Sequence, residues 1–216
     1  MARIVFDLDG TLIDSAPDIR GVANGVLERD GHAPISLDQT RDFIGNGAHV
    51  FVGRMRAVRG IPDRDQDRMY ADFVQRYQTA VGLTVCYPNV VAALEALVSR
   101  GHSLGICTNK PYVPTLAVVA HLGLDRFFDV IVGGDSLAQH KPDPTPLHHA
   151  FQAMPDGEKI YVGDSEVDAQ TAQRAGVPFL LFSEGYRKTP VDQIPHEAAF
   201  SDYDQLVTLI DQVPAA

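Results

Sequence analysis

The sequence contains little cysteine. Its 216 residues include only Cys86 and Cys107, which form no CxxC pair, so neither a disulfide scaffold nor a cysteine-rich zinc site is expected. Long apolar runs are also missing. No stretch approaches the roughly 20 apolar residues of a membrane span, and the residues after Met1 lack the apolar segment of a signal peptide. We expect a cytoplasmic protein that does not bind membranes.

Positive charge is scarce as well. Eighteen Lys and Arg residues stand against 28 Asp and Glu residues, which gives a formal net charge of -10 and a pI of about 5.1. This balance argues against nucleic acid as a partner. Hydrophobic residues make up 45% of the chain and charged residues 21%, an ordinary ratio for a folded protein, so extended disorder is excluded.

The chain from about residue 84 onward alternates between strand-like and helix-like patterns. Short apolar runs predict four strands, and a fifth strand is predicted near the N-terminus; they span residues 3–7, 103–107, 129–133, 159–162 and 178–182. Helical patterns precede and separate the later runs, at residues 89–100, 111–122, 144–154 and 165–175. Alternation at this spacing predicts an α/β fold, with a parallel sheet covered by helices on both faces.

The segment between the first and second predicted strands has a different character. Residues 15–83 show helical periodicity and no convincing strand, and the spacing of Ser15 and Asp18 resembles a helix capping box. We therefore expect an α/β core made of residues 1–14 and 84–216. An all-helical unit, residues 15–83, is inserted into it after the first strand.

Polar side chains follow four of the five predicted strands. Ligands of open parallel sheets bind beyond the carboxyl ends of the strands, so we expect these side chains to form one site. In chain order they are Asp7, Asp9, Thr108, Asn109, Lys141, Asp164 and Asp168. Asp168 stands one helical turn beyond Asp164, where it also fits the ordinary start of a helix.

The aspartates of this group predict a metal ion. Two carboxylates about 4 Å apart repel by roughly 4 kcal/mol at an effective dielectric constant of about 20. Asp7, Asp9, Asp164 and Asp168 could not all remain ionised at one rim of a sheet without a cation among them. Because the available ligands are oxygen atoms, Mg²⁺ is favoured over zinc.

The remaining groups predict a phosphate. The Lys141 ammonium, the Thr108 hydroxyl and the backbone N–H groups of Gly10 and Thr11 offer donors suited to a phosphoryl group. Carboxylates, a divalent cation, a lysine and hydroxyls together indicate phosphoryl transfer.

Four motifs in this order resemble those of the haloacid dehalogenase superfamily. They are Asp7-x-Asp9-x-Thr11, Thr108-Asn109-Lys110, Lys141-Pro142 and Gly163-Asp164-x-x-x-Asp168. Along nearly its whole length the chain is similar to bacterial phosphoglycolate phosphatases of that superfamily. The resemblance implies a Rossmann-like core with an inserted helical cap. Because dehalogenases lack the acid at the position of Asp9, it also implies a phosphatase.

The resemblance further implies catalytic and metal-binding roles. Asp7 would be the nucleophile that forms an aspartyl-phosphate, and Asp9 would be the general acid and then the general base. Mg²⁺ would be bound by Asp7, by the backbone carbonyl of Asp9 and by Asp164. Asp168 would be either a further ligand or a support of the others.

Substrate binding is implied for two regions. Thr108, Asn109 and Lys141 would bind the phosphate. In the cap, the loop of residues 45–48 resembles a specificity loop, and Arg41 or Arg54 is a candidate for contacting a substrate carboxylate.

The expected reaction is the Mg²⁺-dependent hydrolysis of a small organic phosphate, first of all 2-phosphoglycolate, by a monomer or small homo-oligomer. A sugar-phosphate phosphatase or phosphomutase of the same superfamily would share all the core motifs. A receiver-type signalling module fits less well, because it would carry its phosphoacceptor after a later strand and have no helical insertion. The non-enzymatic alternative is a catalytically silent interaction module.

Overall fold

The computed structural model of the protein describes residues 1–213, and its centre is a six-stranded sheet. The order of the strands is β5-β4-β1-β6-β7-β8, and every neighbouring pair is parallel. The strands are β1 (Ala2–Phe6), β4 (Ser103–Cys107), β5 (Val130–Val132), β6 (Glu158–Gly163), β7 (Phe179–Phe182) and β8 (Ala198–Phe200). The sequence predicted the first five. It missed β8, a strand of three residues of which two are alanines, a residue type with low β-propensity.

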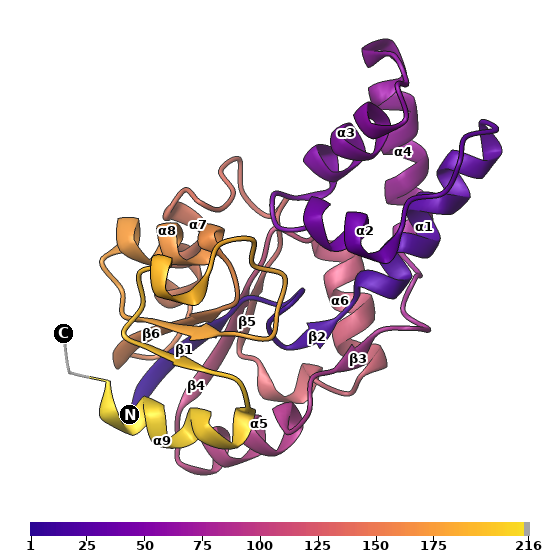
Figure 1. Ribbon diagram of the computed structural model, residues 1–216. Helices are drawn as coiled ribbons and strands as arrows, with labels where there is room; N and C mark the ends of the chain where they lie inside the picture. The colour runs from indigo at the N-terminus through magenta and orange to yellow at the C-terminus, as the bar shows by residue number, and fades with distance from the viewer. Residues whose placement is uncertain (214–216) are drawn as a thin grey trace.

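Helices cover both faces of the sheet, as predicted (Figure 1). Ile4 and Phe6 of β1 pack on the side of α5 (Val90–Ser99), α6 (Tyr112–His121) and α9 (Leu206–Gln212). Val5 points the opposite way and packs with α7 (Thr145–Gln152) and α8 (Glu166–Ala175). Because both faces are buried, the strands are continuously apolar rather than alternating.

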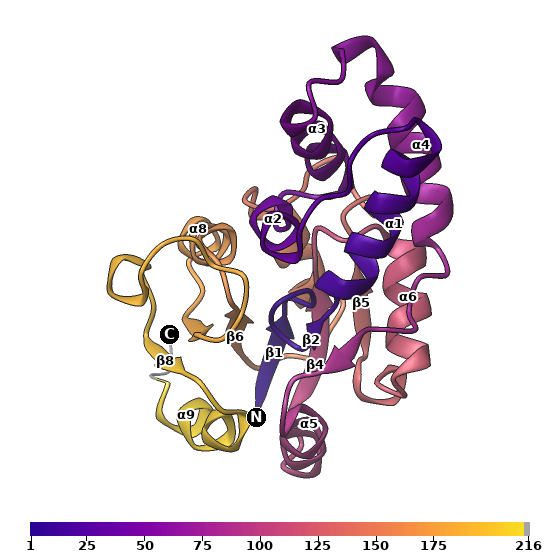
Figure 2. The same cartoon turned by 45° about the vertical axis from the view of Figure 1, so that its right-hand side comes forward.

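The inserted cap consists of four helices, which Figure 2 shows grouped together beside α6 and β2. They are α1 (Ala16–Arg29), α2 (Leu37–Phe43), α3 (Ala48–Val58) and α4 (Gln66–Tyr77). Their apolar faces form a separate core that includes Val26, Phe51, Met55 and Phe73. The α/β core with a helical insertion is therefore confirmed, whereas the boundaries at residues 15 and 83 stay a prediction.

The two chain segments that join the cap to the core pair with each other. β2 (Ile13–Asp14) and β3 (Val85–Cys86) form a small antiparallel sheet that the sequence did not reveal. Asp18 then accepts hydrogen bonds from the backbone N–H groups of Leu83 and Thr84, at 2.9 and 2.7 Å. The predicted capping box of Ser15 and Asp18 is wrong, because both side chains have tertiary partners instead.

Among residues 1–213, none of the helices combines the length and the apolarity that a membrane crossing needs.

Candidate active site

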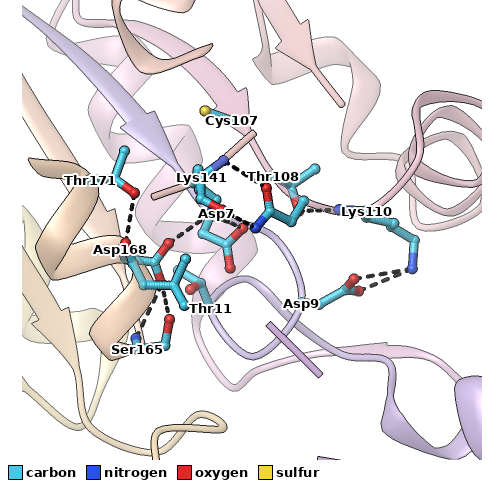
Figure 3. Close-up of polar contacts among 12 residues, drawn as sticks. Asp7, Asp9, Thr11, Cys107, Thr108, Lys110, Lys141, Ser165, Asp168 and Thr171 are labelled. Carbon is cyan, nitrogen blue, oxygen red and sulfur yellow. Dashed lines mark hydrogen bonds and ion pairs between the residues drawn. The ribbon is translucent and has the colours of Figure 1, made fainter. Parts of the chain in front are cut away.

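The carboxyl ends of three neighbouring strands bring the predicted residues together. β1 lies between β4 and β6, with Phe6 opposite both Ile106 and Val162. Asp7, which follows β1, donates its backbone N–H to Val162 at 2.9 Å. Figure 3 shows residues that follow β1, β4 and β6 gathered around one point. Residues more than 100 positions apart in the chain thus share one site, as the order of the strands requires.

Three buried carboxylates form the centre of the site. Oxygen atoms of Asp7, Asp164 and Asp168 all lie within 4.8 Å of one another. Burial raises the pKa of Asp7 to about 6, although the Lys141 charge opposes the change. Burial and the neighbouring Asp168 and Asp7 raise the pKa of Asp164 well above its usual range. Crowding therefore makes full ionisation unfavourable in the absence of a cation.

Lys141 provides one positive charge within this cluster. Its ammonium donates to Asp7 at 2.8 Å, to Asp168 at 2.7 Å and to the Tyr161 hydroxyl at 2.8 Å. The side chain is 3% exposed, and burial alone would lower its pKa. The charges of Asp168 and Asp7 outweigh that effect and raise the pKa, so Lys141 stays protonated.

The donor set fits a divalent cation that prefers oxygen ligands. Three carboxylates and one ammonium carry an excess of negative charge when ionised, and all three candidate ligands are carboxylate oxygens. This chemistry matches Mg²⁺. Asp168 is the most heavily engaged of the three, because one oxygen accepts from Lys141 and the other from the Ser165 hydroxyl at 2.6 Å.

Asp9 lies apart from this cluster. Its carboxylate accepts a hydrogen bond from Ser15 Oγ at 2.5 Å and another from Lys110 Nζ at 3.1 Å. Figure 3 shows Asp9 and Lys110 facing each other, away from the pair of Lys141 and Asp168. The sequence placed Asp9 at the site but did not single out Lys110, although it stands within the Thr-Asn-Lys motif.

The predicted phosphate-binding residues Thr108 and Asn109 differ in their surroundings. Thr108 is 4% exposed and borders a cavity together with Asp7. Both N–H groups of the Asn109 amide donate to backbone oxygens, of Gly45 and of Lys141, each at 2.9 Å. Asn109 therefore links the cap loop to the loop that carries Lys141. Its amide has no free N–H group here, so its contact with the phosphate stays a prediction.

The backbone N–H groups of Gly10 and Thr11 were expected to face a phosphate, and this was wrong. They donate to the carbonyl oxygens of Ile13 and Leu8, at 2.9 and 3.2 Å. The turn after β1 closes on itself, because its backbone groups are buried and must be paired within the chain.

Comparison with known proteins identifies the family. The model of the haloacid dehalogenase-like hydrolases matches residues 4–182. The chain belongs to the haloacid dehalogenase-like hydrolases. A phosphoglycolate phosphatase of Rhodobacter capsulatus is 47% identical over 210 residues, which are 96% of each chain. One of Cereibacter sphaeroides is 46% identical over 213 residues, 97% of this chain and 98% of the relative.

A solved structure supports the same assignment. The crystal structure of "a predicted phosphoglycolate phosphatase" from Haemophilus somnus superposes with a TM-score of 0.89 at 28% identity and covers 96% of both chains. The predicted membership of the haloacid dehalogenase-like hydrolases is confirmed.

In this hydrolase, two of the cavities that the described residues form lie where the cap meets the carboxylate cluster. One lies between cap and core and is bordered by Asp7, Asp9, Phe51, Tyr77 and Lys110, among others. The second reaches Asp164 and Lys188. Gly45 of the cap loop, residues 45–48, borders both cavities, as does Ile44 directly before it, so this segment lies between the cavities.

The two cap arginines considered for substrate binding are occupied within the protein. Arg41 pairs with Asp14 at 3.1 Å. Arg54 donates to the Phe43 carbonyl at 3.1 Å and to Asn46 Oδ1 at 2.8 Å, which supports the cap loop. Neither arginine borders the two cavities. Three lysines do: Lys141, which was predicted, and Lys110 and Lys188, which were not.

A tyrosine that the sequence did not assign to the site also belongs to it. The Tyr186 backbone N–H donates to Asp164 at 2.5 Å, and its hydroxyl accepts from the backbone N–H of Ser15 at 2.9 Å. Tyr186 therefore connects a candidate metal ligand to the start of the cap. The Gly185-Tyr186 pair was visible in the sequence but carried no sign of this contact.

Proposed function

We propose that this hydrolase cleaves small phosphomonoesters, first of all 2-phosphoglycolate, into an alcohol and inorganic phosphate. The observation that supports it best is the position of Asp7, whose carboxylate lies 2.8 Å from the buried Lys141 ammonium and within 4.8 Å of two further carboxylates. A nucleophile next to a cation and a metal-binding cluster suits attack on phosphorus. The high identity to phosphoglycolate phosphatases supports the choice of substrate.

The proposed reaction has two steps. A carboxylate oxygen of Asp7 bonds to phosphorus while the bond from phosphorus to the ester oxygen breaks, and Asp9 gives its proton to the departing alkoxide. Asp9 then takes a proton from water, whose oxygen attacks the aspartyl-phosphate. Inorganic phosphate leaves and the Asp7 carboxylate is restored.

The surrounding groups hold the phosphoryl in place. Thr108 would bind its oxygens, the positive charge of Lys141 would stabilise them, and Asp168 keeps Lys141 oriented through their 2.7 Å contact. The side chains of Asp7 and Asp164 and the backbone carbonyl of Asp9 would hold Mg²⁺, which when bound stabilises the negative charge of the transferring group. A cytoplasmic location and a monomeric or small homo-oligomeric state belong to the same proposal.

A panel of phosphoesters tests this function. We expect kcat/KM with Mg²⁺ to be highest for 2-phosphoglycolate, with inorganic phosphate as a product. Hexose phosphates assayed side by side test the alternative, because a mutase would return an isomer instead. A wild-type enzyme that prefers a hexose phosphate would contradict the proposed substrate.

Asp7→Asn tests the nucleophile. The amide cannot form the acyl-phosphate, so we expect kcat to fall by about 10³-fold or more while the circular dichroism spectrum is unchanged. Asp192→Asn, at an exposed position, removes the same charge and serves as the control. Appreciable turnover by a clean Asp7→Asn preparation would argue against this assignment.

A further inference from the structure

Lys110 is a buried ammonium group at the contact between the core and the cap. The residue is 6% exposed and follows β4. Its Nζ lies 3.1 and 3.4 Å from the two Asp9 oxygens, donates to the Tyr77 hydroxyl, and stands 4.2 Å from the centre of the Tyr77 ring. Tyr77 ends α4 of the cap. Because burying a lysine is costly, this position calls for an explanation.

The cavity between cap and core has an uneven distribution of charge. Asp7, Asp9 and Thr108 border it from the core, whereas Ile19, Phe51 and Phe73 border it from the cap. Among the described residues that border this cavity, Lys110 carries the one cationic side chain.

The other buried lysine of the site, Lys141, forms its contacts within the carboxylate cluster. The three N–H groups of Lys141 have three partners, Asp7, Asp168 and the Tyr161 hydroxyl. This lysine therefore serves the end of the site where the phosphoryl group would lie. Lys110 stands at the opposite end, beside Asp9, as Figure 3 shows.

We propose that Lys110 and the Tyr77 hydroxyl bind a carboxylate on the leaving group of the substrate and so determine specificity. This inference rests on the proposed function. Asp9 protonates the ester oxygen, so the leaving group must lie next to Asp9. In 2-phosphoglycolate a single methylene group separates that oxygen from the carboxylate carbon, and the carboxylate therefore comes within reach of the Lys110 ammonium.

Two donors are available at this point. The Lys110 ammonium makes three hydrogen bonds to two groups, the Asp9 carboxylate and the Tyr77 hydroxyl, and the longer Asp9 contact, at 3.4 Å, can be exchanged for a substrate oxygen. The Tyr77 hydroxyl accepts from Lys110 and, within residues 1–213, donates to no protein acceptor. Burial raises the pKa of Tyr77 well above its usual value, so the phenol keeps its proton. A cation and a hydroxyl donor side by side match the two oxygens of a carboxylate.

The inference predicts how substrates are discriminated. Once Asp9 carries the proton that it donates, a neutral leaving group would leave the buried Lys110 without a counter-ion, and sites with unpaired buried polar groups reject such analogues strongly. Phosphoglycolamide, in which an amide replaces the carboxylate, is the matched neutral substrate. We expect wild-type kcat/KM to favour phosphoglycolate over phosphoglycolamide by at least about 100-fold.

The test compares this ratio between variants. In Lys110→Met we expect the preference for phosphoglycolate to fall at least tenfold, mainly through a higher KM for phosphoglycolate. Any effect of losing the Asp9 contact acts on both substrates and cancels in the ratio. Tyr77→Phe, which keeps the ring against Phe73, should lower the ratio less. Lys188→Met, in the second cavity, should keep it.

Three results would overturn the inference. The first is an equal loss of kcat/KM for both substrates in Lys110→Met. The second, which applies if Lys110→Met fails to fold, is an unchanged ratio of the two kcat/KM values in Tyr77→Phe. The third is a fall of this ratio in Lys188→Met instead. A wild-type enzyme that hydrolyses phosphoesters without favouring a carboxylate would contradict the proposed substrate as well. If the wild type favours phosphoglycolate and Lys110→Met keeps that preference, the inference alone fails.

Discussion

Asp7 and Asp9 stand two positions apart in the sequence, yet their carboxylates have different surroundings. Asp7 lies against Lys141 within the cluster of three acids, and burial raises its pKa to about 6. Asp9 instead accepts from Ser15 and Lys110. Two carboxylates whose environments differ in this way can take separate roles, one as nucleophile and one as acid and base.

Asp9→Ala tests this separation. Because the proton donor is lost while the backbone carbonyl at position 9 remains, we expect kcat to fall by about 10²- to 10⁴-fold and Mg²⁺ affinity to change little. Steady-state kinetics and calorimetric titration with Mg²⁺ measure the two effects. Equal losses of turnover and of Mg²⁺ affinity would assign Asp9 to metal support instead.

At the scale of the elements, the junction between β6 and α8 sets the position of Asp168. Gly163 ends β6, and a Cβ atom built on it would lie 2.5 Å from the Asp168 Cβ. Absence of a side chain at Gly163 therefore allows Asp168 to approach Lys141 and Ser165. Gly163 is required for steric reasons, because the Asp168 Cβ is attached directly to the backbone of α8 and cannot move aside.

Gly163→Ala should displace Asp168. We expect a loss of stability of about 1–3 kcal/mol, measured by urea unfolding, together with a lower kcat, because Lys141 loses its orientation. Gly21→Ala is the matched control. Gly21 lies in α1 with no neighbour near its built Cβ, so the same change should stabilise the protein by about 0.5–1 kcal/mol. A Gly163→Ala enzyme as stable and active as wild type would contradict this account.

The junction between cap and core depends on Asp18 of α1. One of its carboxylate oxygens accepts from the backbone N–H groups of Leu83 and Thr84 and from the Thr84 hydroxyl, at 2.7–2.9 Å. This contact holds the outgoing segment against the start of the cap, beside the pair of β2 and β3.

Asp18→Ala should loosen this junction. The buried N–H group of Thr84 and the partly buried one of Leu83 lose their acceptor, and we expect a loss of about 2–4 kcal/mol in the free energy of unfolding. Amide hydrogen exchange at Leu83 and Thr84 should become faster at the same time. Thr84→Val removes only the hydroxyl contact and should cost about 1 kcal/mol. If Asp18→Ala does not accelerate exchange at these two amides, this contact does not hold the junction.

At the scale of the whole molecule, the acidic cluster links stability to pH and to metal. Burial raises the folded-state pKa of Asp7 from 3.8 to about 6. The folded protein therefore holds this proton more tightly than the unfolded chain does. The contribution of Asp7 to the free energy of unfolding is therefore greatest below about pH 4, and it decreases as the pH rises toward 6.

The prediction concerns the metal-free protein. At pH 7 with a chelator, we expect Asp7→Asn to be more stable than wild type, by up to about 3 kcal/mol, and at pH 4 the difference should shrink to below about 1 kcal/mol. Saturating Mg²⁺ should reverse the order at pH 7, because the Asp7 carboxylate binds the cation more tightly than a neutral amide oxygen does. Thermal unfolding at the two pH values measures this. A wild-type protein that is more stable than Asp7→Asn in chelator at pH 7 would refute it.

The sequence by itself determined the α/β core, the helical insertion and the identity of the acids at the strand ends. These features follow from local periodicity and from the identity of the residues directly after strands, and both can be recognised in short stretches of sequence. The positions of Lys110 and Tyr186, the pairing of β2 with β3 and the partners of Asn109, Ser15 and Asp18 were decided by the tertiary structure alone. Each of these depends on a contact between segments that are distant in the chain. Short elements and single polar residues show no sequence periodicity from which such a partner could be predicted.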